Sequence, residues 1–146
     1  MENGAMIDTI VHAQALAANG DPEGALGLYD TLWAEAIRAE DQYQACIVAH
    51  FMGHAHIEPE AQLDWHLRAL RAADSVGDER VRAFYPSLYA NLGEVYLRLG
   101  NLAQARAFIA QACATEHVLQ DDGYGRMMRS LIVRVTQAVE RDNARD

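Results

Sequence analysis

A turn signal followed by an amphipathic run occurs three times in this chain, and the repetition constrains the fold more than any other feature. The three segments align without gaps and begin at Gly20-Asp21-Pro22, Ile57-Glu58-Pro59 and Gly100-Asn101-Leu102. Glycine commonly ends a helix, whereas Asp, Asn or Pro commonly begins one. After each turn, apolar residues recur at the helical steps of three and four residues. The repeat therefore predicts helices that pair as antiparallel hairpins.

The same signals, read along the whole chain, predict seven helices and no strand. We expect the helices over residues 4–19, 22–39, 41–55, 59–76, 78–99, 102–119 and 124–141. Pro86 lies inside the fifth of these ranges. Because proline lacks a backbone N–H and clashes with the preceding turn, we expect one helix with a kink between Arg82 and Pro86.

The third unit shows how the two helices of a hairpin meet. It combines small and large residues on facing helices: Tyr89, Leu92, Gly93 and Tyr96, then Ala105, Ile109 and Ala112. This pattern resembles the tetratricopeptide repeat, a helix–turn–helix unit of about 34 residues. In that family, small residues at the eighth, twentieth and twenty-seventh positions let the helices touch. The segments 72–80 and 91–96 are also similar to the sensor-type domains of bacterial regulators.

The resemblance implies an all-α fold, a right-handed solenoid of three helical hairpins with a C-terminal capping helix. It places the repeats at about residues 6–39, 43–76 and 86–119 and the capping helix at about 124–141, within a single domain of residues 1–146. Three stacked units are about the minimum for independent stability.

Charge and missing residue types narrow the function. The chain has 21 acidic and 12 basic residues and a net charge of −9, and every basic residue is arginine. Phosphate backbones repel so acidic a chain, so we expect no nucleic-acid partner. The absence of lysine excludes Schiff-base enzymes, P-loop nucleotidases and standard protein kinases. Because no long apolar run and no basic N-terminal signal occur, we expect a cytoplasmic protein with no membrane contact.

The middle unit departs from the family pattern. His50 stands at its eighth position, Gln62 at its twentieth and His66 at its twenty-fourth, where small or apolar residues are usual. His54 follows His50 by one helical turn on the same face. Three interpretations stay open: an internal hydrogen-bond network, a ligand or acid–base site, and a metal site with His66 or Glu94 as third ligand. We expect no metal and no cofactor.

In such arrays the first helix of each hairpin lines a concave groove. Carrying the family's lining positions onto this sequence gives Ile7, Ile10, Gln14, Ala17, Gln44, Ile47, Phe51, His54, Ser87, Ala90, Glu94, Leu97 and Arg98. From these positions, the histidines, one aromatic and one arginine of the last helix, we select nine candidate binding residues: Gln14, His50, Phe51, His54, His66, Tyr89, Glu94, Arg98 and Arg129.

The resemblance and these residues favour a binding, adaptor or sensor protein rather than an enzyme. Its groove would hold a peptide, a protein segment or a small molecule. The alternative is a small-molecule-binding or catalytic protein of a bacterial biosynthetic or resistance pathway, with a pocket centred on His50, His54 and His66. A homodimer is a further alternative, because short solenoids expose apolar end faces.

Overall fold

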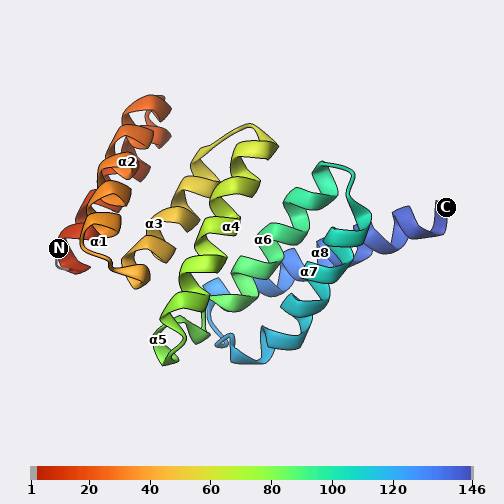
Figure 1. Cartoon of the computed structure of the whole chain (residues 1–146). Coiled ribbons are helices and arrows are strands. Elements are labelled where there is room, and N and C mark those ends of the chain that lie inside the picture. The colour runs from red at the N-terminus through yellow and green to blue at the C-terminus, as the bar shows by residue number, and fades with distance from the viewer. Residues whose placement is uncertain (1–2, 146) are drawn as a thin grey trace. The chain divides into compact units, whose positions relative to one another are not determined.

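The computed structural model describes the backbone of residues 3–145 and the side chains of residues 4–142. Its regular elements in this range are all helices, with no strand, which confirms the all-α prediction (Figure 1). The elements are α1 (Asn3–Ala18), α2 (Pro22–Arg38), α3 (Gln42–Ala55), α4 (Pro59–Val76), α5 (Glu79–Arg82), α6 (Tyr85–Arg98), α7 (Leu102–Thr115), the 3-10 helix η1 (Glu116–Val118) and α8 (Gly123–Arg145). Neighbouring helices pack in pairs, as expected for a tetratricopeptide-like repeat.

The chain forms two compact units, which we call the N-terminal unit (Met1–Val76) and the C-terminal unit (Gly77–Asp146). α1 to α4 make up the first unit, and its core joins α1, α2 and α3 through Met6, Ile10, Ala13, Ala25, Tyr29, Leu32, Val48 and Met52. α5 to α8 make up the second. The sequence predicted a single domain of residues 1–146, and the division into two compact units does not test that prediction.

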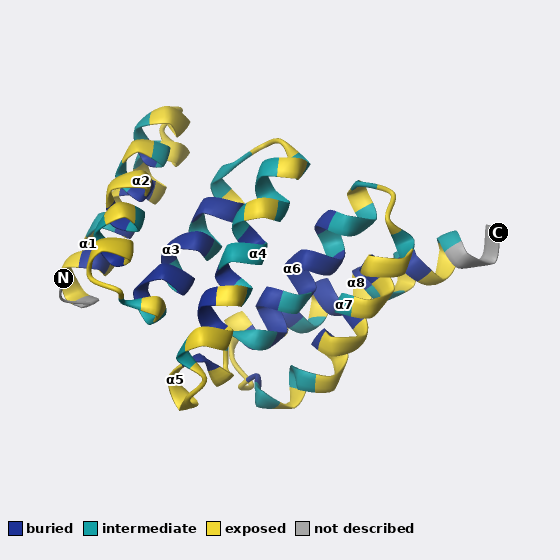
Figure 2. Ribbon diagram, in the orientation of Figure 1, coloured by how far each residue is buried: buried dark blue, intermediate teal, exposed yellow. Residues whose placement is uncertain are grey.

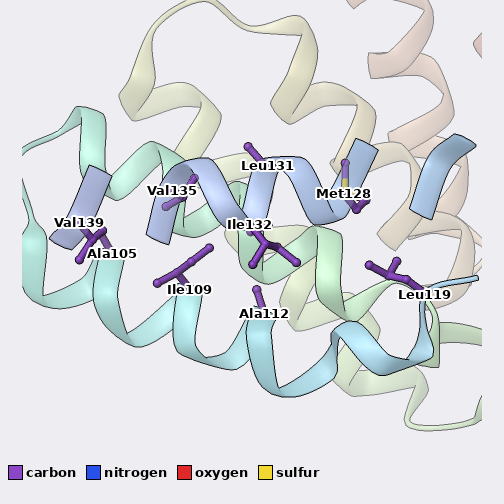
Figure 3. Packing of buried hydrophobic residues seen from close by; sticks show 10 residues of the cluster. Ala105, Ile109, Ala112, Leu119, Met128, Leu131, Ile132, Val135 and Val139 are labelled. Atoms are coloured by element: carbon purple, nitrogen blue, oxygen red, sulfur yellow. The ribbon is translucent and has the colours of Figure 1, made fainter. Parts of the chain in front are cut away.

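In the C-terminal unit, α7 packs against α8 through a row of apolar side chains. Figure 3 shows Ala105, Ile109 and Ala112 of α7 pointing toward Ile132 and Val135 of α8. The α7 residues recur at steps of four and three, so they share one helical face. The capping helix is therefore joined to the third hairpin by a buried apolar core. Figure 2 shows the buried faces of both units in dark blue.

The helix ends follow the turn chemistry of the sequence. Gly20, Gly77 and Gly100 all have positive φ, at 88°, 63° and 79°. The side chains of Asp21, Asp78 and Asn101 then accept hydrogen bonds from backbone N–H groups in the first turn of the next helix. Such caps satisfy N–H groups that have no partner within the helix. These boundary predictions are confirmed.

The prediction of one kinked helix over residues 78–99 is wrong. The structure has a single turn, α5, and a separate helix, α6, that begins at Tyr85. Pro86 lies in the first turn of α6, where its missing N–H would have had no helical partner. Ser87 Oγ donates to Phe84 O at 2.9 Å across this start. The proline thus begins a helix instead of bending one.

The last two predicted helices also differ at their ends. α7 stops at Thr115 and continues only as the 3-10 turn η1, so the expected end at residue 119 lies four residues too far along the chain. α8 extends to Arg145, beyond the expected end at 141.

Candidate functional site

An apolar groove runs between α1 and α3 in the N-terminal unit. Its volume is about 250 Å³, and it is lined by Met6, Ile7, Ile10, Val11, Gln14, Tyr43, Ile47 and Phe51. Met6 and Ile10 are buried and form its floor. Ile7 and Val11 form its rim and remain 54% and 57% exposed. We call this feature the apolar groove.

Helical spacing builds both walls of the apolar groove. On α1 the lining residues recur at steps of three and four, and on α3 Tyr43, Ile47 and Phe51 follow at steps of four. Tyr29 of α2 stacks behind Phe51, with 6.2 Å between ring centroids. This contact holds the Phe51 ring in position from the core side.

The apolar groove contains several positions that the sequence proposed for a concave face. Ile7, Ile10, Gln14, Ile47 and Phe51 all line it. Ala17, Gln44 and His54 do not line it, and Gln44 is buried inside the unit. Sequence reasoning missed Met6, Val11 and Tyr43. The two four-residue steps from Tyr43 through Ile47 to Phe51 were the signal that could have found the tyrosine.

A second groove lies between α6 and α8 in the C-terminal unit, and it differs in charge. Its volume is about 480 Å³, and its lining residues are Glu94, Leu97, Arg98, Arg134, Val135, Gln137, Ala138 and Arg141. We call it the arginine groove. Glu94 and Arg98 were proposed from the sequence as binding residues, and both lie here. Arg141 was missed, because nothing in the repeat pattern covers the end of α8.

Two other candidates lie outside both grooves. Arg129 donates hydrogen bonds to the carbonyl oxygens of Leu119, at 2.7 Å, and Gln120, at 3.2 Å. The guanidinium therefore secures the backbone after η1, where carbonyls lack helical partners. Tyr89 packs against the core of its unit, with its ring centroid 6.3 Å from that of Phe108.

The structure brings the three candidate histidines together at the seam of α3 and α4. The ring centroids of His50 and His54 are 4.7 Å apart, those of His54 and His66 are 5.1 Å apart, and those of His50 and His66 are 6.2 Å apart. His66 is buried, whereas His54 is exposed. We call these residues the histidine cluster.

The close approach of α3 to α4 occurs at Gly53. A Cβ there would collide with the imidazole of His66, lying 2.6 Å from Nδ1 and 2.7 Å from Nε2. His50, at the eighth position of the repeat, lies one turn earlier on α3. Gln62 donates from Nε2 to His56 O at 2.6 Å, so it bridges the turn between the two helices.

His50 is held in its neutral form. Burial, and then the nearby His54, lower the pKa of His50 from 6.5 to about 3. Its Nδ1 is buried and has no hydrogen-bond partner in the protein. A neutral imidazole with so low a pKa is a poor general base or acid near neutral pH. Among the side chains that the structure describes, no three His, Cys, Asp or Glu are arranged to hold a metal ion.

A third cavity of about 290 Å³ borders α2, α3 and α4 and is lined by Trp33, Gln42, Arg68, Arg71, Ala72 and Ser75. Here the two tryptophans pack edge to face with 5.0 Å between centroids. The Arg68 guanidinium lies 4.3 Å from the Trp65 centroid, a cation–π contact that covers the ring. None of these three cavities is lined by the histidine cluster.

No helix in the described range is long and apolar enough to cross a membrane. Comparison with protein families gives a match to a family model described as a tetratricopeptide repeat, over residues 9–31 and 86–111. These ranges cover most of the α1–α2 pair and of the α6–α7 hairpin, and neither includes α3 or α4. No curated protein and no solved structure matches the chain. The similarity to sensor-type bacterial regulators stays a prediction.

Proposed function

The chain is a tetratricopeptide repeat protein, and from this premise we propose that it binds a segment of another protein in its apolar groove. Repeats of this kind suggest a protein-binding or adaptor role. The observation that carries the proposal is the exposure of Ile7 and Val11, more than half of each, beside a hollow lined by other apolar side chains. Exposed apolar surface rimming a groove is typical of binding sites.

The occupant proposed for the apolar groove is the apolar face of an amphipathic helix. The lining residues of α1 extend from Met6 to Gln14, which is about 12 Å of helix axis at 1.5 Å per residue. That length matches two turns of a partner helix. A helix in a groove presents anchors at positions i, i+4 and i+7. Leucine or phenylalanine anchors would contact Ile10, Ile47 and Phe51.

The test uses a displayed library of amphipathic helical peptides, selected against the full chain, with affinities measured by fluorescence anisotropy. We expect enriched peptides to carry large apolar residues on one face. Ile7→Glu and Val11→Glu should each weaken their binding at least tenfold, because each places a carboxylate on the apolar rim. Ile37→Glu is the matched control, since Ile37 is 48% exposed on α2 and lies outside the groove.

Two outcomes would overturn the proposal. The first is selection that enriches no peptide over an empty display. The second is equal binding of the enriched peptides to the parent chain and to Ile7→Glu. A third outcome changes the occupant: a sedimentation mass of twice 16.2 kDa that Ile7→Glu halves would identify a second copy of this chain, the homodimer, as the ligand and would also reject the proposed partner.

The alternative function, small-molecule binding or catalysis at the histidine cluster, has less support. The three rings contact one another, none of them lines a described cavity, and His50 stays neutral at physiological pH. The proposal also includes a cytoplasmic location, where this adaptor would bind its partner.

A further inference from the structure

The arginine groove concentrates positive charge in an acidic protein. The chain as a whole carries a net charge of −9, yet three of the eight lining residues are arginines and only one is acidic. Arg134 and Arg141 project from one face of α8, because seven residues are close to two helical turns. Arg98 faces them from α6. The local charge of this groove therefore opposes that of the chain.

Several other arginines already bind partners within the chain. Arg68 pairs with Asp64, Arg80 with Asp78 and Arg126 with Asp121, and Arg129 binds backbone carbonyls. In contrast, Arg134 and Arg141 have no ion-pair partner among the described side chains, and both are exposed. Their guanidinium groups are thus available to a ligand.

The floor of the arginine groove is apolar. Val135 is buried in the core between α7 and α8, and Leu97 packs against the same core. Ala138 lies between the two arginines of α8 and leaves room above the floor. A ligand that fits this arrangement has carboxylates for the arginines and a medium-sized apolar side chain for the floor.

We propose that the arginine groove binds an extended acidic segment of another protein, with two carboxylates paired to Arg134 and Arg141. Guanidinium groups recognise carboxylates through two parallel hydrogen bonds, which makes arginine well suited to this role. The two arginines are separated by about 10 Å along α8. In an extended segment with polyproline II geometry, residues three apart lie on the same face and are separated by about 9 Å. The inference concerns the C-terminal unit alone and does not depend on the apolar groove.

A protein segment fits better than a nucleic acid. The long-range field of a chain with net charge −9 repels a polyanion. A segment with two carboxylates experiences little of that repulsion and gains the local charge of the groove. A single-stranded DNA oligomer is therefore the comparison ligand in the test.

The test titrates the full chain with a labelled nine-residue peptide that carries Asp at positions 3 and 6 and Leu at position 5. The control peptide carries Asn in place of both Asp residues. At 50 mM salt we expect the acidic peptide to bind at least tenfold more tightly than the Asn peptide. The double variant Arg134→Gln, Arg141→Gln should reduce its affinity to that of the Asn peptide, and 200 mM salt should weaken binding to the parent.

Arg126→Gln is the matched control, because Arg126 is also exposed on α8 but lies outside the groove and pairs with Asp121. It should leave the affinity for the acidic peptide within twofold. A loss in Arg126→Gln as large as that in the double variant would overturn the proposal, since it would show unspecific attraction. Equal affinity for the Asp and Asn peptides, or tighter binding of a single-stranded DNA oligomer, would overturn it as well.

Discussion

In the α6–α7 hairpin, Gly93 lies flat against α7: a Cβ there would lie 3.5 Å from both Ala105 O and Ile109 N, an ordinary contact distance. In the α3–α4 hairpin, His66 takes the place of Ile109 in the repeat, and Gly53 provides the space for its ring. The alignment of the repeats pairs Gly93 with His50 instead. The point of closest approach between α3 and α4 therefore lies at Gly53, three residues further along α3 than the position that aligns with Gly93.

The turn between α3 and α4 also differs from the turn between α6 and α7. Gly100, with φ of 79°, reverses the chain after α6, and Asn101 caps α7. After α3 the chain leaves through His56 in an extended conformation, and Gln62 binds the carbonyl of that residue. A repeat can thus accept a buried imidazole when a glycine lies one turn further along and a side chain secures the altered turn.

The largest expected effect is a difference in stability between alanine substitutions at Gly53 and at Gly93. Gly53→Ala should lower the free energy of unfolding of the N-terminal unit by about 3 kcal/mol, because the new Cβ collides with a buried ring that has little room to move. Gly93→Ala should change that of the C-terminal unit by under about 1 kcal/mol, since its Cβ meets atoms at normal distance and alanine favours the helix.

Urea unfolding can follow the two units separately. Both tryptophans, Trp33 and Trp65, lie in the N-terminal unit, so tryptophan fluorescence reports that unit, and circular dichroism reports both. Replacing His66 by alanine should recover part of the loss in the Gly53→Ala background. Equal effects of the two glycine substitutions would show that the seams do not differ as described.

The second-largest expected effect is a loss of stability of the N-terminal unit at acidic pH. Because the pKa of His50 is about 3 in the folded protein and about 6.5 in the unfolded chain, the unfolded state binds the additional proton between these values. The contribution of His50 to stability is therefore fully present above pH 6.5 and is lost as the pH decreases toward 3. At pH 5 this residue alone should remove about 2 kcal/mol from the N-terminal unit. Fluorescence-detected urea unfolding at pH 7.5 and pH 5 measures it.

The control for the acid effect is His50→Leu, which removes the titrating ring from the α3–α4 seam. The difference in unfolding free energy between pH 7.5 and pH 5 should shrink by about 2 kcal/mol in this variant, whatever its absolute stability. An unchanged difference would place the acid sensitivity elsewhere. The α6–α7 hairpin contains no histidine, so it has no matching contribution.

The smallest effect compares the turns. Asn101→Ala should cost about 1 kcal/mol by removing the cap that accepts from Gln104 N. The loss should be visible by circular dichroism and absent from tryptophan fluorescence, because Asn101 belongs to the C-terminal unit. Gln62→Ala, which removes the bridge to His56 O, should change both signals, because Gln62 lies in the unit that contains the tryptophans. A fluorescence change in Asn101→Ala would contradict the separation of the two hairpins.

The sequence was most informative where one residue type determines local geometry. Glycine followed by Asp or Asn marked the turns at Gly20 and Gly100, and both glycines have positive φ where a helix ends. The lining positions of the family, carried onto this sequence, also placed Ile7, Ile10 and Phe51 in one groove, and all three line the apolar groove. Both kinds of inference depend on neighbours along the chain, which the sequence displays directly.

Contacts between helices were harder to infer. Pro86 fits either a kinked helix or a helix start, and the local pattern does not distinguish them. The role of Gly53 depends on how far α3 rolls against α4, which repeat spacing alone does not determine. Arg129 resembled a groove residue, yet unsatisfied carbonyls ten and nine residues before it bind its guanidinium. Tertiary partners decided these cases.

The two cysteines of the chain have opposite chemical environments. Cys46 is buried, and burial together with Asp74 raises its pKa to about 12, so its thiol is inert at neutral pH. Cys113, on α7 in the C-terminal unit, is exposed. A maleimide or iodoacetamide dye will therefore attach at one place without any substitution. With the tryptophans of the other unit as donors, the labelled chain then contains a resonance-energy-transfer pair with one member in each unit.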